Sequence, residues 1–220
     1  MEKKFLLTHG SSKTPVILQV PDGMPVQRVV LGVHGIGGSS QDAIQTGIAE
    51  EMVMFSCASV RFDFPCHGEN PTDTMSVAGC VESLTAVAGW IRQNFPHVED
   101  LCIFASGFGA YITLDQLKKD GKTTFRVARP FDGTYEFYKE LAQNLVLVTQ
   151  PIPMLILHGE EDSFIRMADI QNFRRINEDS KLVIIPGTTH QFLEDGAWDM
   201  VLDLTRDWFA FEQVLLCDWE

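Results

Sequence analysis

The sequence has few basic residues, no paired cysteine motif and no long apolar segment. Its 220 residues include 17 Lys and Arg against 30 Asp and Glu, so the net charge is −13. Such a surface repels phosphate backbones, and nucleic acid is therefore not an expected partner. The five cysteines are odd in number and contain no C-x-x-C pair, which argues against a disulfide framework and against a zinc ribbon.

No apolar run approaches the roughly 20 residues that cross a bilayer. The apolar start is too short for a signal peptide and is interrupted by His9. We therefore expect a cytoplasmic protein without a membrane partner. The length and the 45% apolar content fit a single domain over residues 1–220. The sequence does not indicate an oligomeric state.

Short β-type runs alternate with helical patterns along most of the chain. Strands are predicted at 5–7, 16–20, 28–33, 57–62, 101–104, 124–127, 154–158 and 182–185. Helices are predicted at 42–54, 74–94, 108–119, 136–145 and 165–176 and in the tail from Val201. This order predicts an α/β fold, in which a mostly parallel, twisted sheet of about eight strands carries helices on both faces as a three-layer sandwich.

Glycine-rich or polar loops follow five of the predicted strands. They read H-G-I-G-G-S at 34–39, D-F-P-C-H-G-E at 63–69, A-S-G-F-G at 105–109, G-E-E-D at 159–162 and P-G-T-T-H at 186–190. Ligands of such sheets bind at the carboxyl ends of the strands. A turn of small residues, then an acid, then a histidine is the chain order of a hydrolase triad.

Together these motifs resemble the α/β-hydrolase family, and within it the small serine esterases and serine aminopeptidase-like hydrolases. H-G-I-G-G-S resembles the oxyanion loop, and the stretch at 61–69 resembles R-x-D-x-P-G-H-G-x, with Cys66 in place of a glycine. The likeness extends from about residue 28 to residue 209. The family usually carries a lid before the acid, and here only about residues 128–150 are available for a minimal one.

The turn at 105–109, which we call the elbow, lacks a hydroxyl where the family needs one. The pattern is small-x-nucleophile-x-small, so small residues at Ala105 and Gly109 put Gly107 in the nucleophile position. Making Ser106 the nucleophile would put Phe104 and Phe108 where small residues are needed. The nucleophile of an elbow has a positive φ, a conformation that costs glycine little. Ser106 remains the alternative nucleophile.

The resemblance also implies roles for the other site residues. His190 would be the general base, and Asp162 the carboxylate that orients it. The backbone N–H groups of Ile36 and Phe108 would form the oxyanion hole. The alternative for Asp162 and His190 is a hydrogen bond that only ties two loops together.

Four further residues near these loops have simpler interpretations. We expect His34 and His67 to support their loops by hydrogen bonds rather than to bind a metal. Ser39 is predicted as a helix N-cap. Cys66 is interpreted as a bystander thiol, with a position in the same pocket as the alternative.

The resemblance implies a serine hydrolase that acts on small carboxylic esters without a cofactor or metal. With Gly107 at the nucleophile position, we expect weak activity or none. The alternative function is a non-catalytic member of the fold, a pseudoenzyme that binds a small ligand or a protein. The sequence does not identify the substrate.

Overall fold

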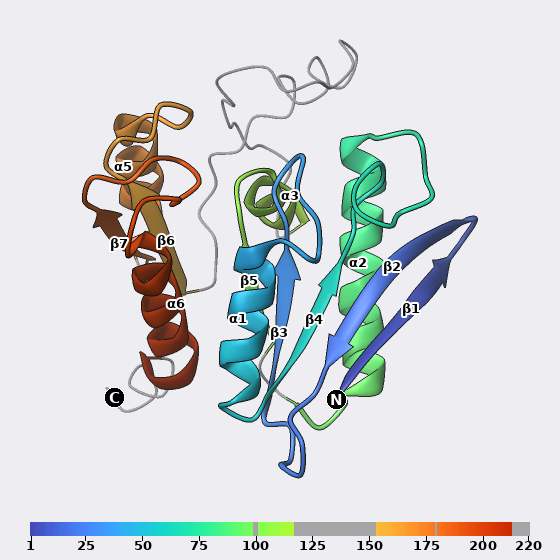
Figure 1. The fold of residues 1–220 in the computed structure, drawn as a ribbon. Coiled ribbons are helices and arrows are strands. Elements are labelled where there is room, and N and C mark those ends of the chain that lie inside the picture. Colours follow the sequence, from blue (N-terminus) through green and yellow to red (C-terminus); the bar gives the residue numbers. More distant parts are fainter. Residues whose placement is uncertain (99–100, 117–152, 179, 213–220) are drawn as a thin grey trace. The chain divides into compact units, whose positions relative to one another are not determined.

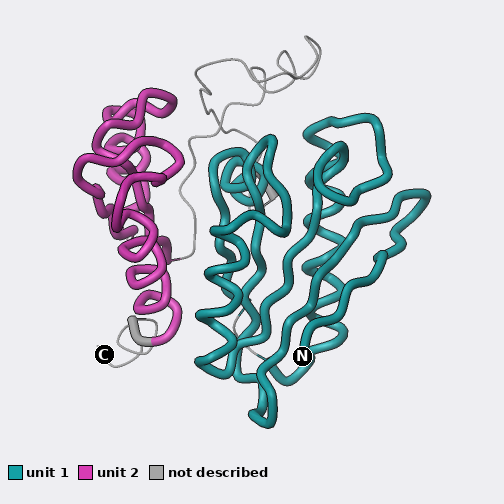
Figure 2. The backbone as a smooth tube through the Cα atoms, in the orientation of Figure 1, with its two compact units in different colours: residues 1–116 teal, residues 117–220 magenta. Residues whose placement is uncertain are grey.

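The computed structural model describes residues 1–98, 101–116, 153–178 and 180–212. The chain divides into two compact units, residues 1–116 and residues 117–220, which Figure 2 colours separately. We describe each unit by itself. The expectation of a single domain over residues 1–220 stays a prediction.

A five-stranded sheet forms the centre of the first unit (Figure 1). Its strands are β1 (Glu2–His9), β2 (Ser12–Gln19), β3 (Arg28–Val33), β4 (Cys57–Phe62) and β5 (Leu101–Ala105). The order in the sheet is β1-β2-β4-β3-β5. The β1–β2 hairpin and the β2–β4 pair are antiparallel, whereas β3 runs parallel to both β4 and β5.

Both faces of the central strands are covered, and in β4 this burial includes Ser59 and Arg61 beside the apolar residues. All six residues of β4 are buried, and five of the six residues of β3 are buried. A continuous apolar run, rather than an alternating one, is typical of a strand that lies between two helical layers. In the outer strand β1, exposed and half-buried residues alternate, which fits an edge strand.

Three helices cover the two faces of this sheet. They are α1 (Ala43–Val53), α2 (Val77–Asn94) and α3 (Phe108–Gln116). Helix α1 packs on β3 and β4, and α2 and α3 pack against each other on the opposite face (Figure 1). The unit is therefore a three-layer sandwich, as the sequence predicts.

The helix starts differ in how they are capped. The Ser76 side chain accepts a hydrogen bond from the Gly79 N–H and caps α2. The prediction of Ser39 as an N-cap is wrong, because α1 begins at Ala43 and its N-cap residue is Asp42, three residues after Ser39. The Ser39 hydroxyl instead donates to the Asp42 carboxylate within the turn that precedes the helix.

The second unit contains two parallel strands and the helices that flank them. The strands are β6 (Met154–Gly159) and β7 (Ser180–Ile185), and the helices are α5 (Met167–Ile176), α6 (Ala197–Asp207) and the short π-helix η1 (Trp208–Glu212). Helix α5 connects the two strands and packs on β7. A helix between two parallel strands is the βαβ arrangement that the alternating pattern predicts.

The described residues thus form seven strands, and three of the five strand pairings are parallel. The predicted strand at 124–127, the helix at 136–145 and the minimal lid at 128–150 lie outside the described residues. Within the part of the chain that the structure describes, no helix is long and apolar enough to cross a membrane.

Candidate active site

The elbow connects β5 to α3 and turns at a single residue. The strand ends at Ala105, the helix begins at Phe108, and between them Gly107 has a φ of +50°. This left-handed conformation costs a residue with a Cβ about 1–2 kcal/mol. Ser106 precedes the turn and is fixed by its N–H, which donates to the Val33 carbonyl at 3.1 Å. Gly107 is therefore the apex of the turn and Ser106 is not.

Gly109 allows the elbow to approach β3 closely. A Cβ at this position would lie 2.5 Å from the carbonyl oxygens of both Val33 and His34. Those atoms belong to the backbone and have no flexible end that could move aside. The contact between α3 and the end of β3 thus explains why the pattern requires a small residue two positions after the apex.

The Ser106 side chain lies toward the loop that follows β3. Its hydroxyl is 3.7 Å from the position that a Cβ on Gly35 would occupy, and its carbonyl is 3.4 Å away. Ile36, one of the two predicted oxyanion donors, is the next residue of that loop and is half-buried. Phe108, which carries the other predicted donor, is buried and packs its ring edge-on against Phe64 at 5.9 Å.

Two histidines connect the loop at 34–39, the predicted oxyanion loop, to the loop after β4. The Phe64 N–H donates to His34 Nε2 at 3.1 Å, and the Gly37 N–H donates to His67 Nε2 at 2.9 Å. Each imidazole donates its Nδ1–H to a carbonyl in its own loop, Gly35 for His34 and Pro65 for His67. The prediction that these histidines support their loops is confirmed.

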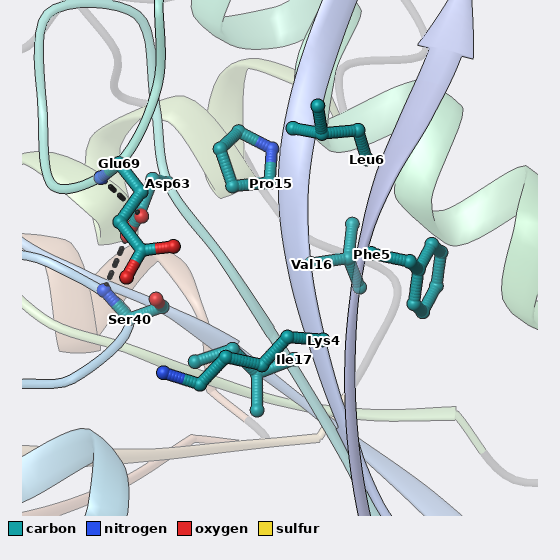
Figure 3. Close-up of a pocket in the computed structure, with 9 residues that line it drawn as sticks. All are labelled: Lys4, Phe5, Leu6, Pro15, Val16, Ile17, Ser40, Asp63 and Glu69. Atoms are coloured by element: carbon teal, nitrogen blue, oxygen red, sulfur yellow. Dashed lines mark hydrogen bonds between the residues drawn. The ribbon is translucent and has the colours of Figure 1, made fainter.

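Asp63 adds a third connection between the same loops. Its carboxylate accepts the Ser40 N–H at 2.7 Å and the Glu69 N–H at 2.8 Å, as Figure 3 shows. These three residues form part of the wall of a cavity of about 320 Å³ on the hairpin side of the loops. Its other lining residues are Lys4, Phe5, Leu6, Pro15, Val16 and Ile17. Among the described residues, none of the predicted site residues lines this cavity.

In the second unit, Asp162 and His190 lie in contact at the ends of β6 and β7. Nδ1 of His190 donates to Oδ2 of Asp162 at 2.7 Å. The other carboxylate oxygen, Oδ1, accepts the N–H groups of Phe164 and Ile165 at 2.7 and 2.9 Å. The carboxylate is 3% exposed and the imidazole 30% exposed. A carboxylate that only accepts places the imidazole proton on Nδ1, which leaves the lone pair of Nε2 available as a base.

The hydrogen bonds of Asp162 keep it ionised despite its burial. Burial by itself raises the pKa of this carboxyl, but the hydrogen bonds from His190, Ile165 and Phe164 outweigh it and hold the pKa below its usual range. The acid of this pair is therefore a carboxylate near neutral pH, as an orienting group must be.

Sequence reasoning gave no role to a second histidine beside Asp162. Nδ1 of the buried His158 lies 3.6 Å from the same Oδ2 that holds His190. Burial lowers the pKa of His158, and the attraction of Asp162 opposes that effect without cancelling it. The signal was present in H-G-E-E-D, where the histidine precedes the acid by four residues.

Two other neighbours of His190 were also missed. The Phe164 ring lies against the imidazole with 5.1 Å between ring centroids, and 44% of this residue is exposed. Glu194 accepts both the hydroxyl and the N–H of Thr189, the residue before His190. An aromatic residue two positions after the acid and a glutamate four positions after the histidine are visible in the sequence, but their contacts depend on loop geometry that no periodicity encodes.

The structure thus brings Asp162 and His190 together in the second unit, and in the first unit it places the elbow beside the loop at 34–39, whose oxyanion role stays a prediction. Within the described part of the chain, no group of three His, Cys, Asp or Glu residues is placed to hold a metal ion. Cys66 is exposed and has a φ of +63°.

Solved structures of several hydrolases have the same fold as this chain. Est1E from Butyrivibrio proteoclasticus, solved with bound ferulic acid, aligns with a TM-score of 0.78 and 18% identity over 93% of this chain and 97% of that one. An α/β serine hydrolase homologue from Coxiella burnetii aligns with a TM-score of 0.68 and 23% identity, over 92% of this chain and 94% of that one. A serine hydrolase without a lid from Xanthomonas campestris aligns with a TM-score of 0.67 and 21% identity, over 93% of this chain and 90% of that one. These likenesses confirm the α/β-hydrolase fold.

Comparisons of sequence are less informative. No protein-family model matches the chain. A Mycobacterium tuberculosis protein whose name assigns it provisionally to the phosphoribosyl transferases is 24% identical over 185 residues. The matched region covers 82% of this chain, and the chain spans about 40% of the length of that relative.

Proposed function

We propose that this chain, which has the α/β-hydrolase fold, binds small carboxylic esters and hydrolyses them slowly without a covalent intermediate. The observation that carries the proposal is the hydrogen bond of 2.7 Å from His190 to the buried Asp162 carboxylate. A pair that only tied two loops together would not need an ionised, buried acceptor together with a half-exposed imidazole.

His190 is the proposed general base. Its Nε2 takes a proton from a water molecule whose oxygen attacks the ester carbonyl carbon. The carbonyl oxygen becomes an oxyanion, which the N–H groups of Ile36 and Phe108 stabilise in this proposal. The intermediate then expels the alkoxide, which takes the proton back from the imidazolium, so that the acid and the alcohol leave and the base is restored.

Gly107 is the proposed nucleophile position of the ancestral reaction. Support comes from its positive φ at the apex of the elbow and from the close approach of Gly109 two residues later. Without a hydroxyl there, no acyl-enzyme forms. Enzymes that lack one triad residue retain rates about 10³–10⁴-fold above water, and we expect the native chain at or below that level.

The proposal includes no cofactor, no metal and no nucleic-acid partner. The net charge of −13 supports the last point. The buried thiols of Cys57, Cys80 and Cys102 fit a reducing compartment such as the cytoplasm. The likeness to a hydrolase described as lacking a lid supports an open site and a compact substrate.

Restoring the hydroxyl tests this function. The native chain and the Gly107→Ser, Gly107→Ala and Gly107→Ser/His190→Ala variants are assayed with p-nitrophenyl acetate. We expect Gly107→Ser to raise kcat/KM by on the order of 10²-fold or more, because a triad member then acts with its partners. Gly107→Ala is the matched control, since it adds a Cβ without a nucleophile.

Two results would contradict the proposal. A folded Gly107→Ser variant no faster than Gly107→Ala would mean that the elbow is misassigned. A gain that survives His190→Ala would mean that the histidine does not serve the elbow.

The second candidate function is binding without turnover. Ferulic acid, an aromatic carboxylic acid, is bound in the Est1E structure, and in this chain the exposed Phe164 ring lies beside His190. Titration with ferulate, followed by calorimetry, separates the two candidates. Saturable binding that Phe164→Ala weakens, together with ester hydrolysis no faster than in buffer, would favour a binding protein.

A further inference from the structure

The oxyanion loop is held by acceptors that exist only on neutral histidines. His34 lies on the loop after β3, and His67 lies on the loop after β4. Each one accepts a backbone N–H of the opposite loop at its Nε2, from Phe64 and from Gly37. The connection is therefore reciprocal, and each loop supplies one acceptor and one donor.

The Nδ1 atoms fix which tautomer is present. Nδ1 of His34 lies 2.7 Å from the Gly35 carbonyl, and Nδ1 of His67 lies 2.8 Å from the Pro65 carbonyl. A carbonyl only accepts, so each Nδ1 carries the proton and each Nε2 carries the lone pair. No second tautomer satisfies both contacts of either ring.

We propose that His34 and His67 form a pH-sensitive latch on residues 35–37, closed while both imidazoles are neutral, in which a second proton on either imidazole from solvent opens the backbone bond that this imidazole accepts. A proton on Nε2 occupies the lone pair that accepts the backbone N–H of Gly37 or Phe64. The imidazole Nε2–H then faces that backbone N–H, and the hydrogen bond is lost. That the latch controls Ile36 as an oxyanion donor rests on the proposed function.

The surroundings of the pair favour the closed latch at neutral pH. His34 is 1% exposed and His67 is 9% exposed, and their ring centroids are 5.1 Å apart. Two imidazolium charges at that distance repel each other. Burial lowers the pKa of His34, the hydrogen bond to Gly35 opposes that effect, and His67 lowers it further.

The acidic groups that face His34 raise its pKa, but they offset the lowering by burial only in part. They are Asp63, on the loop after β4, and Asp42, at the start of α1. Both carboxylates also accept backbone N–H groups, Ser40 for Asp63 and Ser39 for Asp42. The Asp63 connection does not use an imidazole, so opening the latch releases residues 35–37 and leaves Ser40 held.

Nuclear magnetic resonance of the full chain tests the latch without a substrate. Long-range nitrogen–proton spectra report the tautomer of each imidazole, and amide hydrogen exchange reports the Gly37 and Phe64 N–H groups between pH 8 and pH 5. Ser40 is the internal control. After correction for intrinsic exchange, we expect protection of Gly37 to fall as the pH is lowered from 8 to 5, while that of Ser40 does not change.

Two variants of His67 separate titration from simple support. His67→Gln keeps an acceptor and a donor but takes up no proton in this range. We expect its Gly37 protection to be independent of pH, whereas His67→Leu should lose protection at every pH. His97→Gln, at an exposed histidine after α2, is the matched control and should behave like the native chain.

An Nε2–H tautomer at pH 7.5, or Gly37 protection that stays constant from pH 8 to pH 5, would overturn the latch. If the glutamine variant did not fold, the native titration would decide the matter by itself. The amide measurements involve no ester, so a chain without hydrolytic activity can still show the latch. That result would remove only the proposed function.

Discussion

At the scale of single residues, two turns have a positive φ at positions where the chain departs from the α/β-hydrolase pattern that its motifs resemble. The family pattern has a glycine where Cys66 lies, and here a residue with a Cβ adopts a φ of +63°. The pattern has a nucleophile where Gly107 lies, and here the residue at a φ of +50° has no side chain. Both turns thus have left-handed backbone at the position concerned, and the loss of a nucleophile at Gly107 stays a proposal.

Substitutions at these two positions should change stability in opposite directions. Gly107→Ala forces a Cβ into the left-handed region and should lower the free energy of unfolding by about 1–2 kcal/mol. Cys66→Gly removes the strain of the left-handed conformation but increases the entropy of the unfolded chain. It should raise the free energy of unfolding by about 0.5–1 kcal/mol. Urea unfolding measures both.

Gly89→Ala, in the middle of α2, is the control for the first substitution. A Cβ at Gly89 meets nothing within 4 Å, so alanine should stabilise the helix by about 0.5–1 kcal/mol. Equal effects at Gly89 and Gly107 would contradict the assignment of strain to the apex of the elbow.

The Asp162 carboxylate should contribute stability that depends on pH. Asp162→Asn removes charged hydrogen bonds from a buried site and should cost about 1.5–3 kcal/mol at pH 7. Because the folded pKa of Asp162 lies below its unfolded value of about 3.9, this contribution is complete above that value. It is lost as the pH falls through the lower folded pKa.

Urea unfolding at pH 7 and at successively lower pH values follows this effect. Asp195→Asn, at an exposed position in the loop before α6, is the control and should change little. A constant difference between the native chain and Asp162→Asn down to pH 2 would argue against an ionised acid.

At the scale of elements, two glycines bring the functional loops close to neighbouring strand ends. Gly109, in α3, faces the Val33 and His34 carbonyls, and Gly159, at the end of β6, faces those of Thr188 and Thr189. In both cases a Cβ would lie 2.5 Å from two backbone oxygens. The same device thus positions the elbow in one unit and the His190 loop in the other.

Alanine at either glycine should therefore be costly. Gly109→Ala and Gly159→Ala should each lower the free energy of unfolding by about 1–3 kcal/mol, because overpacking against backbone is not relieved by rotamer changes. Gly89→Ala serves again as the control. Alanine variants as stable as the native chain would mean that these contacts are not close in solution.

The elements that sequence predicted best are the buried ones. The strands at 28–33 and 57–62 were predicted with the observed bounds, since glycine- and proline-containing polar loops begin directly after Val33 and Phe62. The hairpin strands proved longer than their apolar cores, because backbone pairing from Glu2 to His9 extends beyond the buried residues. The bounds of α1 were predicted to within one residue, but its N-cap was assigned to Ser39 rather than Asp42, because both are good capping residues.

The sequence proposed members of a candidate site, whose roles stay predictions, but it did not predict the contacts around them. Motif order and loop position pointed to Gly107, Asp162 and His190, and the structure places the last two in contact. His158 and Phe164 were missed because their roles depend on distances within a loop. The reciprocal bonds of His34 and His67 were expected only as loop support, since a sequence does not say which backbone N–H each imidazole meets.

At the scale of the whole molecule, the buried histidines should make the fold sensitive to mild acid. Burial lowers the folded pKa of both His34 and His158 below the unfolded value of about 6.5. Below that pH the unfolded chain binds more protons than the folded one, so stability falls as the pH falls. Stability should be fully present above about pH 6.5 and decline toward pH 5.

Urea unfolding of the native chain between pH 8 and pH 5 measures this decline. His97→Gln, at an exposed position, should leave its slope unchanged. A free energy of unfolding that is constant over this range would mean that neither buried histidine is held neutral by the fold.

The central claim is that the elbow of this hydrolase fold turns at a residue without a nucleophile. The most direct measurement treats the native chain and Gly107→Ser with a fluorophosphonate, which reacts with activated serines, and maps any adduct by mass spectrometry. We predict no adduct on the native chain and one adduct, at position 107, on the variant. An adduct on Ser106 of the native chain would contradict the account.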